Sequence, residues 1–151
     1  MKGLLLIICI STLFSLPAFA KGLFEGVEAK SCFESSPDIH QQNNCISDAA
    51  DKSAHKLDAL IHVTSKRITA FNSAPFDIKG PAIPTIGDVY SQRFLKAQVI
   101  WKRYRNELCL AVAGEIYEDS WDYPLFIDQC EINLNKRHMA EIEAMGFDTD
   151  E

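Results

Sequence analysis

The amino-acid sequence predicts an all-α fold in which a long amphipathic helix packs on an antiparallel helical hairpin, with disulfides as staples. Apolar residues recur at helical spacing in three long segments, whereas period-two alternation of useful length and Asn-Gly or Asp-Gly hairpin turns are absent from the sequence. Proline and glycine separate the first two segments, and a glycine followed by an acidic, aromatic loop separates the last two. An even number of cysteines follows the N-terminal apolar run, which favours a disulfide framework.

Residues 1–20 are expected to form a cleavable secretory signal peptide. Lys2 supplies the basic start, residues 3–16 supply an almost uncharged apolar run, and Ala18-Phe19-Ala20 matches the cleavage pattern of signal peptidase. The apolar run is shorter than the ~20 residues that a membrane-spanning helix needs. The protein is therefore expected to be periplasmic or secreted, with no membrane span after cleavage.

The remaining residues, 21–151, suit a single acidic helical domain. Removal of Lys2 leaves 14 basic residues against 21 acidic ones and a net charge of −7. Such a charge argues against nucleic acid and anionic lipid as partners and favours a cationic partner.

Four cysteines remain after cleavage, and no two of them have the CxxC spacing of zinc or redox sites. In an oxidising compartment they are expected to form two disulfides rather than a metal site. Three connectivities exist in principle, and we prefer the local one, Cys32 with Cys45 and Cys109 with Cys130.

The first long helix is predicted from Ile46 to Phe71. Its apolar and small residues form one narrow stripe; they are Ile46, Ala50, Ala54, Leu57, Leu60, Ile61, Thr64, Ile68 and Phe71. Asp51, His55, Asp58 and His62 lie on the opposite ridge. We interpret this ridge as a solvated face and not as a metal site, because His55 and His62 are two turns apart.

Residues 72–85 contain several prolines and a glycine, so they are expected to form a connecting loop. A second helix is predicted from about Gly87 to Ala113. One face of it carries Tyr90, Phe94, Ala97, Trp101, Tyr104, Leu108 and Val112. We expect the aromatic stripe of Phe94, Trp101 and Tyr104 to be core. Gln98 and Arg105 share this stripe, so each needs a hydrogen-bonding or charged partner, unless they form a ligand site.

A third helix is predicted from near Pro124 to about Met145, because proline suits a first helical turn. Ile127, Cys130, Leu134 and Met145 are expected to face inward, and residues 148–151 to form a frayed acidic tail.

A bond between Cys109 and Cys130 would clamp the hairpin and place residues equally far from it opposite one another. Gln98 would then reach Glu141, and Trp101 would pack beside His138. Arg105 would face an apolar residue, so we expect its acidic partner on the first helix, at Asp58.

The residues Ala97, Gln98, Trp101, Tyr104, Arg105 and Cys109 resemble, in type and spacing, a motif of the lysozyme inhibitor LprI-like family of small exported bacterial proteins. Further matches extend the resemblance over residues 32–142; they are Cys32, Gln41, Asn43, Cys45, Cys130, Leu134, Arg137 and His138. The chain departs from the family where Ala54, Leu57 and Asp58 replace an Asp and a later Leu-Asn pair. It departs again where residues 115–123 replace a Gly-Gly-Ser loop. The resemblance implies an exported protein that inhibits lysozyme by binding it.

The loop before the third helix is the candidate surface for a basic partner such as lysozyme. Its acidic and aromatic residues are Glu115, Tyr117, Glu118, Asp119, Trp121, Asp122 and Tyr123. The alternative is an ordinary hairpin loop with Trp121 and Tyr123 packed on the helices.

An enzyme is not predicted, because the sequence has no Gly-x-Ser-x-Gly elbow, phosphate-binding glycine loop or zincin motif. No cofactor or metal is expected. The rival to lysozyme inhibition is a periplasmic envelope interaction or accessory protein without effect on lysozyme.

Overall fold

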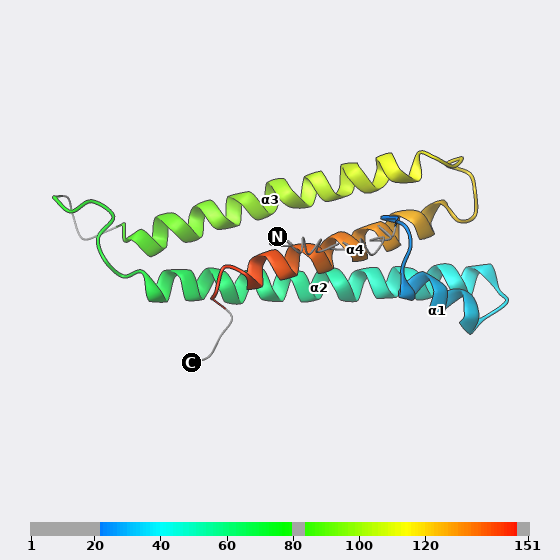
Figure 1. Cartoon of the computed structure of the whole chain (residues 1–151), viewed down its shortest axis with the longest axis horizontal. Helices are drawn as coiled ribbons and strands as arrows, with labels where there is room; N and C mark the ends of the chain where they lie inside the picture. Colours follow the sequence, from blue (N-terminus) through cyan, green and yellow to red (C-terminus); the bar gives the residue numbers. More distant parts are fainter. Residues whose placement is uncertain (1–21, 80–83, 148–151) are drawn as a thin grey trace, which may run out of the picture.

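The computed structural model describes residues 22–79 and 84–147, and all regular secondary structure in these ranges is helical (Figure 1). The helices are α1 (Val27–Ser35), α2 (Ile39–Phe71), α3 (Ile86–Ala113) and α4 (Tyr123–Glu143). The all-α prediction is confirmed. The predicted signal peptide at 1–20 and the predicted tail at 148–151 lie outside the described residues. Within the described ranges, no helix is both long enough and apolar enough to cross a membrane.

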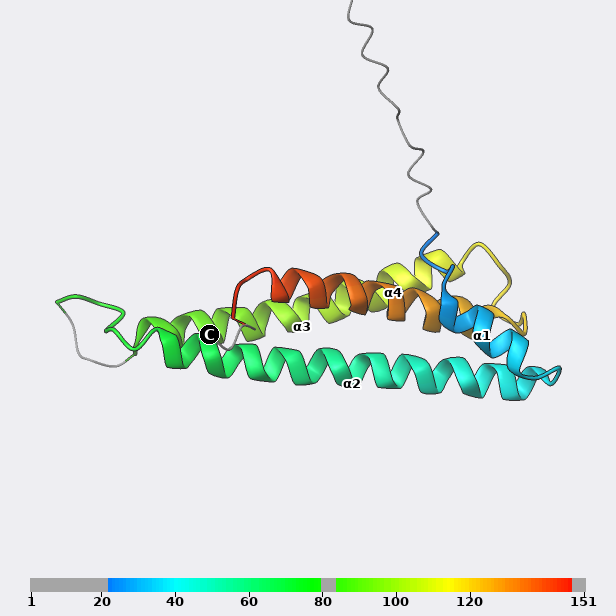
Figure 2. The same cartoon turned by 60° about the horizontal axis from the view of Figure 1, so that its bottom comes forward.

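The long helices α2, α3 and α4 pack side by side, and α1 lies against α2 and α4 at one end (Figures 1 and 2). The short turn between α1 and α2 lies at the same end as the loop between α3 and α4, and the α2–α3 loop lies at the other end. The molecule is therefore elongated, and its two ends differ in structure.

Helix α2 begins seven residues before the predicted start because Asp38 caps it. The Asp38 carboxylate accepts a hydrogen bond from the backbone N–H of His40 at 2.9 Å. The first two turns are polar, so the hydrophobic pattern did not reveal them. Most of the predicted stripe is buried or half-buried, but Phe71 is 71% exposed, so the prediction that it faces the core was wrong.

Helix α3 begins with a capping box formed by Thr85 and Asp88. The Asp88 backbone N–H donates to Thr85 Oγ1, and the Thr85 backbone N–H donates to Asp88 Oδ2. Gly87 follows directly and lies against the end of α2. A Cβ atom at this position would come within 2.9 Å of backbone atoms of Thr69 and Asn72, so the close approach of the two helices depends on glycine.

The buried face of α3 is rotated from the predicted one. Its residues are Gly87, Ser91, Phe94, Gln98, Arg105, Cys109 and Ala113. Phe94 is core as predicted, whereas Trp101 is half-buried and Tyr104 is 55% exposed, so the core assignment of Tyr104 was wrong. The rotation brings polar side chains inward, where they find hydrogen-bond partners on α4.

Helix α4 starts with Pro124 in its first turn, as predicted, and ends two residues before Met145. Both predicted disulfides are present: the Cα atoms of Cys32 and Cys45 are 5.6 Å apart, and those of Cys109 and Cys130 are 5.5 Å apart. The second bond clamps α3 and α4 near their connecting loop.

Helix α1 was not predicted from the sequence. Helix α4 holds it and the preceding residues by polar contacts: Asn133 Nδ2 donates to the carbonyls of Leu23 and Glu25, and Ala29 N–H donates to Gln129 Oε1 at 2.7 Å.

Candidate functional site

The loop between α3 and α4 exposes the predicted acidic and aromatic residues at the end of the bundle. Tyr117 is 84% exposed and Trp121 is 54% exposed. The carboxylate-bearing residues Glu115, Glu118 and Asp119 are also exposed. Exposed aromatic side chains near acidic groups are suited to contact with a basic surface. We call Glu115, Tyr117, Glu118, Asp119 and Trp121 the acidic end surface.

Two of the predicted contact residues, Asp122 and Tyr123, are half-buried where the loop joins α4. Asp122 is half-buried at the start of α4, where its carboxylate accepts a hydrogen bond from the Ser120 hydroxyl. Tyr123 is half-buried and is the first residue of α4. Both residues are therefore less exposed than Tyr117 and Trp121.

Helix α1 adds an aromatic residue to this surface that the sequence analysis did not anticipate. The ring of Phe33 packs edge-on against Trp121, with centroids 6.0 Å apart, and Phe33 is 41% exposed. Asn43 Nδ2 also donates to the Trp121 carbonyl at 3.4 Å. Trp121 is thus held by α1 and α2 while half of its surface stays accessible. The predicted Cys32–Cys45 bond was the one sequence feature that could have indicated this contact. It fixes Phe33, which follows Cys32, beside α2.

Gln98 and Trp101, from the motif that carries the family resemblance, surround His138 of α4. Atoms Nδ1 and Nε2 of His138 lie 2.8 Å from Glu141 Oε2 and 2.6 Å from Gln98 Oε1. The Trp101 ring stacks on the imidazole with centroids 3.9 Å apart. The expected contact of Trp101 with His138 is present, and Gln98 reaches Glu141 through His138 instead of directly.

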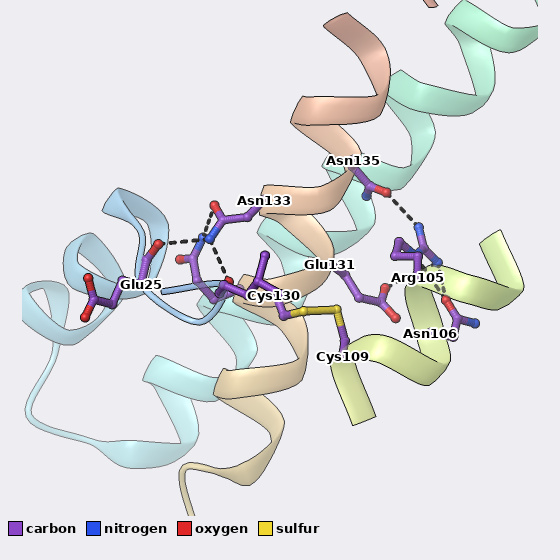
Figure 3. Close-up of a disulfide and its surroundings, with 10 residues drawn as sticks. Glu25, Arg105, Asn106, Cys109, Cys130, Glu131, Asn133 and Asn135 are labelled. Carbon is purple, nitrogen blue, oxygen red and sulfur yellow. Dashed lines mark hydrogen bonds and ion pairs between the residues drawn. A yellow bond between two sulfur atoms is a disulfide. The ribbon is translucent and has the colours of Figure 1, made fainter. Parts of the chain in front are cut away.

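Arg105 lies at the centre of a second polar cluster, next to the Cys109–Cys130 bond (Figure 3). Its Nη1 donates to Asn135 Oδ1 at 2.8 Å, and its Nη2 lies 3.4 Å from Glu131 Oε2. The Nε and Nη2 atoms donate to Asn106 Oδ1. The prediction that Asp58 is the acidic partner of Arg105 was wrong.

Asp58 instead pairs with Lys102 on the outside of the bundle, because Lys102 precedes Arg105 by almost one helical turn and faces α2. The full ridge of Asp51, His55, Asp58 and His62 is exposed. In the described part of the chain, no group of three or more His, Cys, Asp or Glu side chains is arranged to hold a metal ion.

The remaining motif residues, Ala97 and Tyr104, are exposed on α3. Neither residue belongs to the acidic end surface, which lies beyond the end of α3. The structure therefore separates two groups of predicted residues: Gln98, Trp101 and Arg105 fix the register of α3 on α4, and the acidic end surface is available for contact.

Among the carboxyl groups of residues 22–79 and 84–147, ionisation is strongly disfavoured only at Asp128. Burial raises its pKa to about 6, and the neighbouring carboxylates of Glu131 and Asp51 raise the pKa as well. Arg105 is directed at Glu131, so Asp128 has no cation of its own among the described residues. Burial and the neighbouring negative charges therefore oppose ionisation of Asp128 in the folded protein.

Comparison of the chain with protein-family models, with curated proteins and with solved structures gives no match.

Proposed function

We propose that this chain is an exported binding protein, periplasmic or secreted, that uses the acidic end surface to bind a basic protein. Lysozyme is the specific candidate, through the resemblance of residues 97–109 to the lysozyme inhibitor LprI-like family. The observation that carries the proposal is the exposure of Tyr117 and Trp121 among Glu115, Glu118 and Asp119 at one end of a disulfide-stapled bundle.

Electrostatics supports a basic partner. The mature chain has a net charge of −7, and the three exposed carboxylates of the acidic end surface concentrate part of that charge beside the aromatic rings. A basic protein approaching this end is attracted over distances of about one Debye length, ~8 Å at physiological salt. The charges therefore favour fast association and exclude acidic competitors.

Rigidity supports a direct contact. The Trp121 ring packs on Phe33, and the Trp121 backbone carbonyl accepts a hydrogen bond from Asn43, so less side-chain entropy is lost when a partner covers the exposed half of the ring. The two disulfides restrain the flanking elements, since Cys109 and Cys130 lie on either side of the loop and Cys32 lies next to Phe33. Aromatic residues held in this way are typical centres of binding energy.

Clearance of a turbid peptidoglycan suspension by C-type lysozyme, with and without residues 21–151 of this protein, tests the proposal. We expect the protein to slow clearance in proportion to its concentration. Tyr117→Ser should weaken the effect, because Tyr117 is exposed and contributes to the surface without supporting the fold. Ile78→Ser is the matched control, since Ile78 is 98% exposed in the loop at the other end.

Unchanged clearance at a large excess of the folded protein would reject lysozyme inhibition and favour a role as an envelope accessory protein. Equal inhibition by the parent and by Tyr117→Ser would instead reject the acidic end surface as the contact.

A further inference from the structure

A groove lies on the side of the molecule that α3 does not cover. It consists of two adjoining hollows of about 350 and 490 Å³, lined by residues of α1, α2 and α4 only, which share Glu28, Ala49 and Lys52. Figure 2 shows α1 beside one end of α2 and α4. Residues of these three helices line the two hollows. Hollows of this size are in the range of small-molecule sites.

Several of the side chains that line the groove are apolar. Ile132, which is buried, and Met139 line the first hollow, and Val27 and the Cys32–Cys45 disulfide line the second. Val27, the first residue of α1, is 64% exposed despite its aliphatic side chain. An alkyl chain lying along these side chains would remove apolar surface from water.

The rim of the groove is cationic in an otherwise acidic molecule. Lys136 is paired with Glu28, and hydrogen bonds from Lys136 and Gln129 lower the pKa of Glu28 even though partial burial opposes this. Lys52 and Lys56 have no acidic partner in the described part of the chain. They are four residues apart on α2, an arrangement in which like charges destabilise a helix.

We propose that this groove binds a single anionic amphiphile, a molecule with an alkyl chain and a carboxylate or phosphate head group. Lys52 and Lys56 neutralise the head group, and the apolar lining residues from Met139 to Val27 accept the chain. This assignment explains why two unpaired lysines line an apolar groove in a chain with an excess of carboxylates. The attraction is local, within the Debye length, so the net negative charge of the molecule does not cancel it.

Isothermal titration calorimetry of residues 21–151 with dodecyl phosphate, below its micelle-forming concentration, tests the proposal. Dodecanol and inorganic phosphate are titrated alongside it. We expect saturable binding of dodecyl phosphate and at least tenfold weaker binding of either half of the molecule. The Lys52→Gln, Lys56→Gln double variant should lose affinity about tenfold, the effect of removing two exposed ion-pair partners.

The charge-matched control is the Lys96→Gln, Arg103→Gln variant, whose substitutions are exposed on α3 away from the groove and should leave the affinity unchanged. Val27→Asp tests the apolar half: it should also weaken dodecyl phosphate binding, whereas Val63→Asp on the exposed side of α2 should not. Circular dichroism verifies that each variant is folded.

Three results would overturn the proposal. One is the absence of saturable binding of dodecyl phosphate by the folded protein. Another is equal affinity for inorganic phosphate and dodecyl phosphate, which would indicate a simple anion site. The third is equal loss of affinity in the Lys52, Lys56 variant and the α3 control, which would place the effect in overall charge and not in the groove.

Discussion

Arg105 shows how a single buried charge can fix the position of a helix. Its side chain is 11% exposed and is bonded to Asn135 and Asn106, with Glu131 3.4 Å away. Asn135 in turn donates to Ser53 Oγ at 3.2 Å, so the cluster connects α2, α3 and α4. A one-turn shift of α3 would separate the Arg105 guanidinium from Asn135 and Glu131 on α4, which is far more costly than a shift among apolar side chains.

Arg105→Ala should therefore lower the free energy of unfolding by about 3 kcal/mol, because Glu131 and Asn135 lose a buried partner. The neighbouring Arg103→Ala, at an exposed position, should change it by less than about 0.5 kcal/mol. Urea unfolding followed by circular dichroism measures both. Combining Arg105→Ala with Glu131→Ala should give non-additive losses, and combining it with Asp58→Ala should give additive ones. The reverse pattern would contradict the cluster.

Asp128→Asn should stabilise the protein at pH 7. The pKa of Asp128 is raised from 3.8 to about 6, so the folded state binds this proton more tightly than the unfolded state does. Stability contributed by Asp128 is therefore present at low pH and is lost as the pH rises from about 4 to 6. Because the group is only partly buried, we expect a gain of about 1 kcal/mol at pH 7. Unfolding at pH 4 should show almost none, and an equal gain at both pH values would assign the effect to packing.

Residue types and their spacing were enough to predict many buried positions, but not which face of α3 is buried. Phe94, Leu57 and Ile61 are buried as their spacing predicts, because apolar burial dominates where no polar group intervenes. Tyr104 is exposed because Gln98 and Arg105 take the interior and find partners on α4. The sequence indicated that these two residues need partners, but not that Asn135, Glu131 and His138 supply them.

At the scale of elements, the α2–α3 connection depends on close backbone contact. Gly87→Ala should destabilise the protein by about 2 kcal/mol or more, because its Cβ would lie 2.7 Å from the Thr69 carbonyl oxygen and must displace a helix backbone. Thermal unfolding measures the loss. Gln92→Ala, on the exposed side of the same helix, is the control and should be nearly neutral. A neutral Gly87→Ala would show that α2 and α3 can separate at this end without cost.

The Cys109–Cys130 disulfide stabilises the other end of α3. It closes a loop with a sequence separation of 21 residues, so the chain-entropy estimate for its contribution is about 3 kcal/mol. The double variant Cys109→Ser, Cys130→Ser should lose about that amount in urea unfolding. Loss of the bond would also give the loop more freedom. If the variant were as stable as the parent, packing of α3 on α4 alone would hold the acidic end surface.

The three long helices were predictable because each carries an amphipathic pattern over many turns. The α3–α4 boundaries were found within a few residues, since Gly114 and Pro124 mark them. Helix α1 was not found, because nine residues give too short a pattern and tertiary contacts with Gln129 and Asn133 hold its region in place. Its absence from the prediction also hid the contribution of Phe33 to the acidic end surface.

At the scale of the whole molecule, the fold is an elongated scaffold whose end loop is supported by both disulfides. The central claim is that this end binds a basic protein through charge and exposed aromatic rings. Its charge component is testable by changing only Glu118 and Asp119, which are exposed and make no contacts that hold the fold.

The most direct measurement is calorimetric titration of C-type lysozyme into residues 21–151 and into the Glu118→Gln, Asp119→Asn variant, at low salt and at about 0.3 M salt. The control variant Asp77→Asn, Glu143→Gln removes two exposed charges elsewhere. We predict that the parent binds, that the Glu118, Asp119 variant binds about tenfold more weakly at low salt, and that the difference shrinks as salt rises. Equal affinities of the parent and the Glu118, Asp119 variant at low salt, or no binding by the folded parent, would contradict the claim.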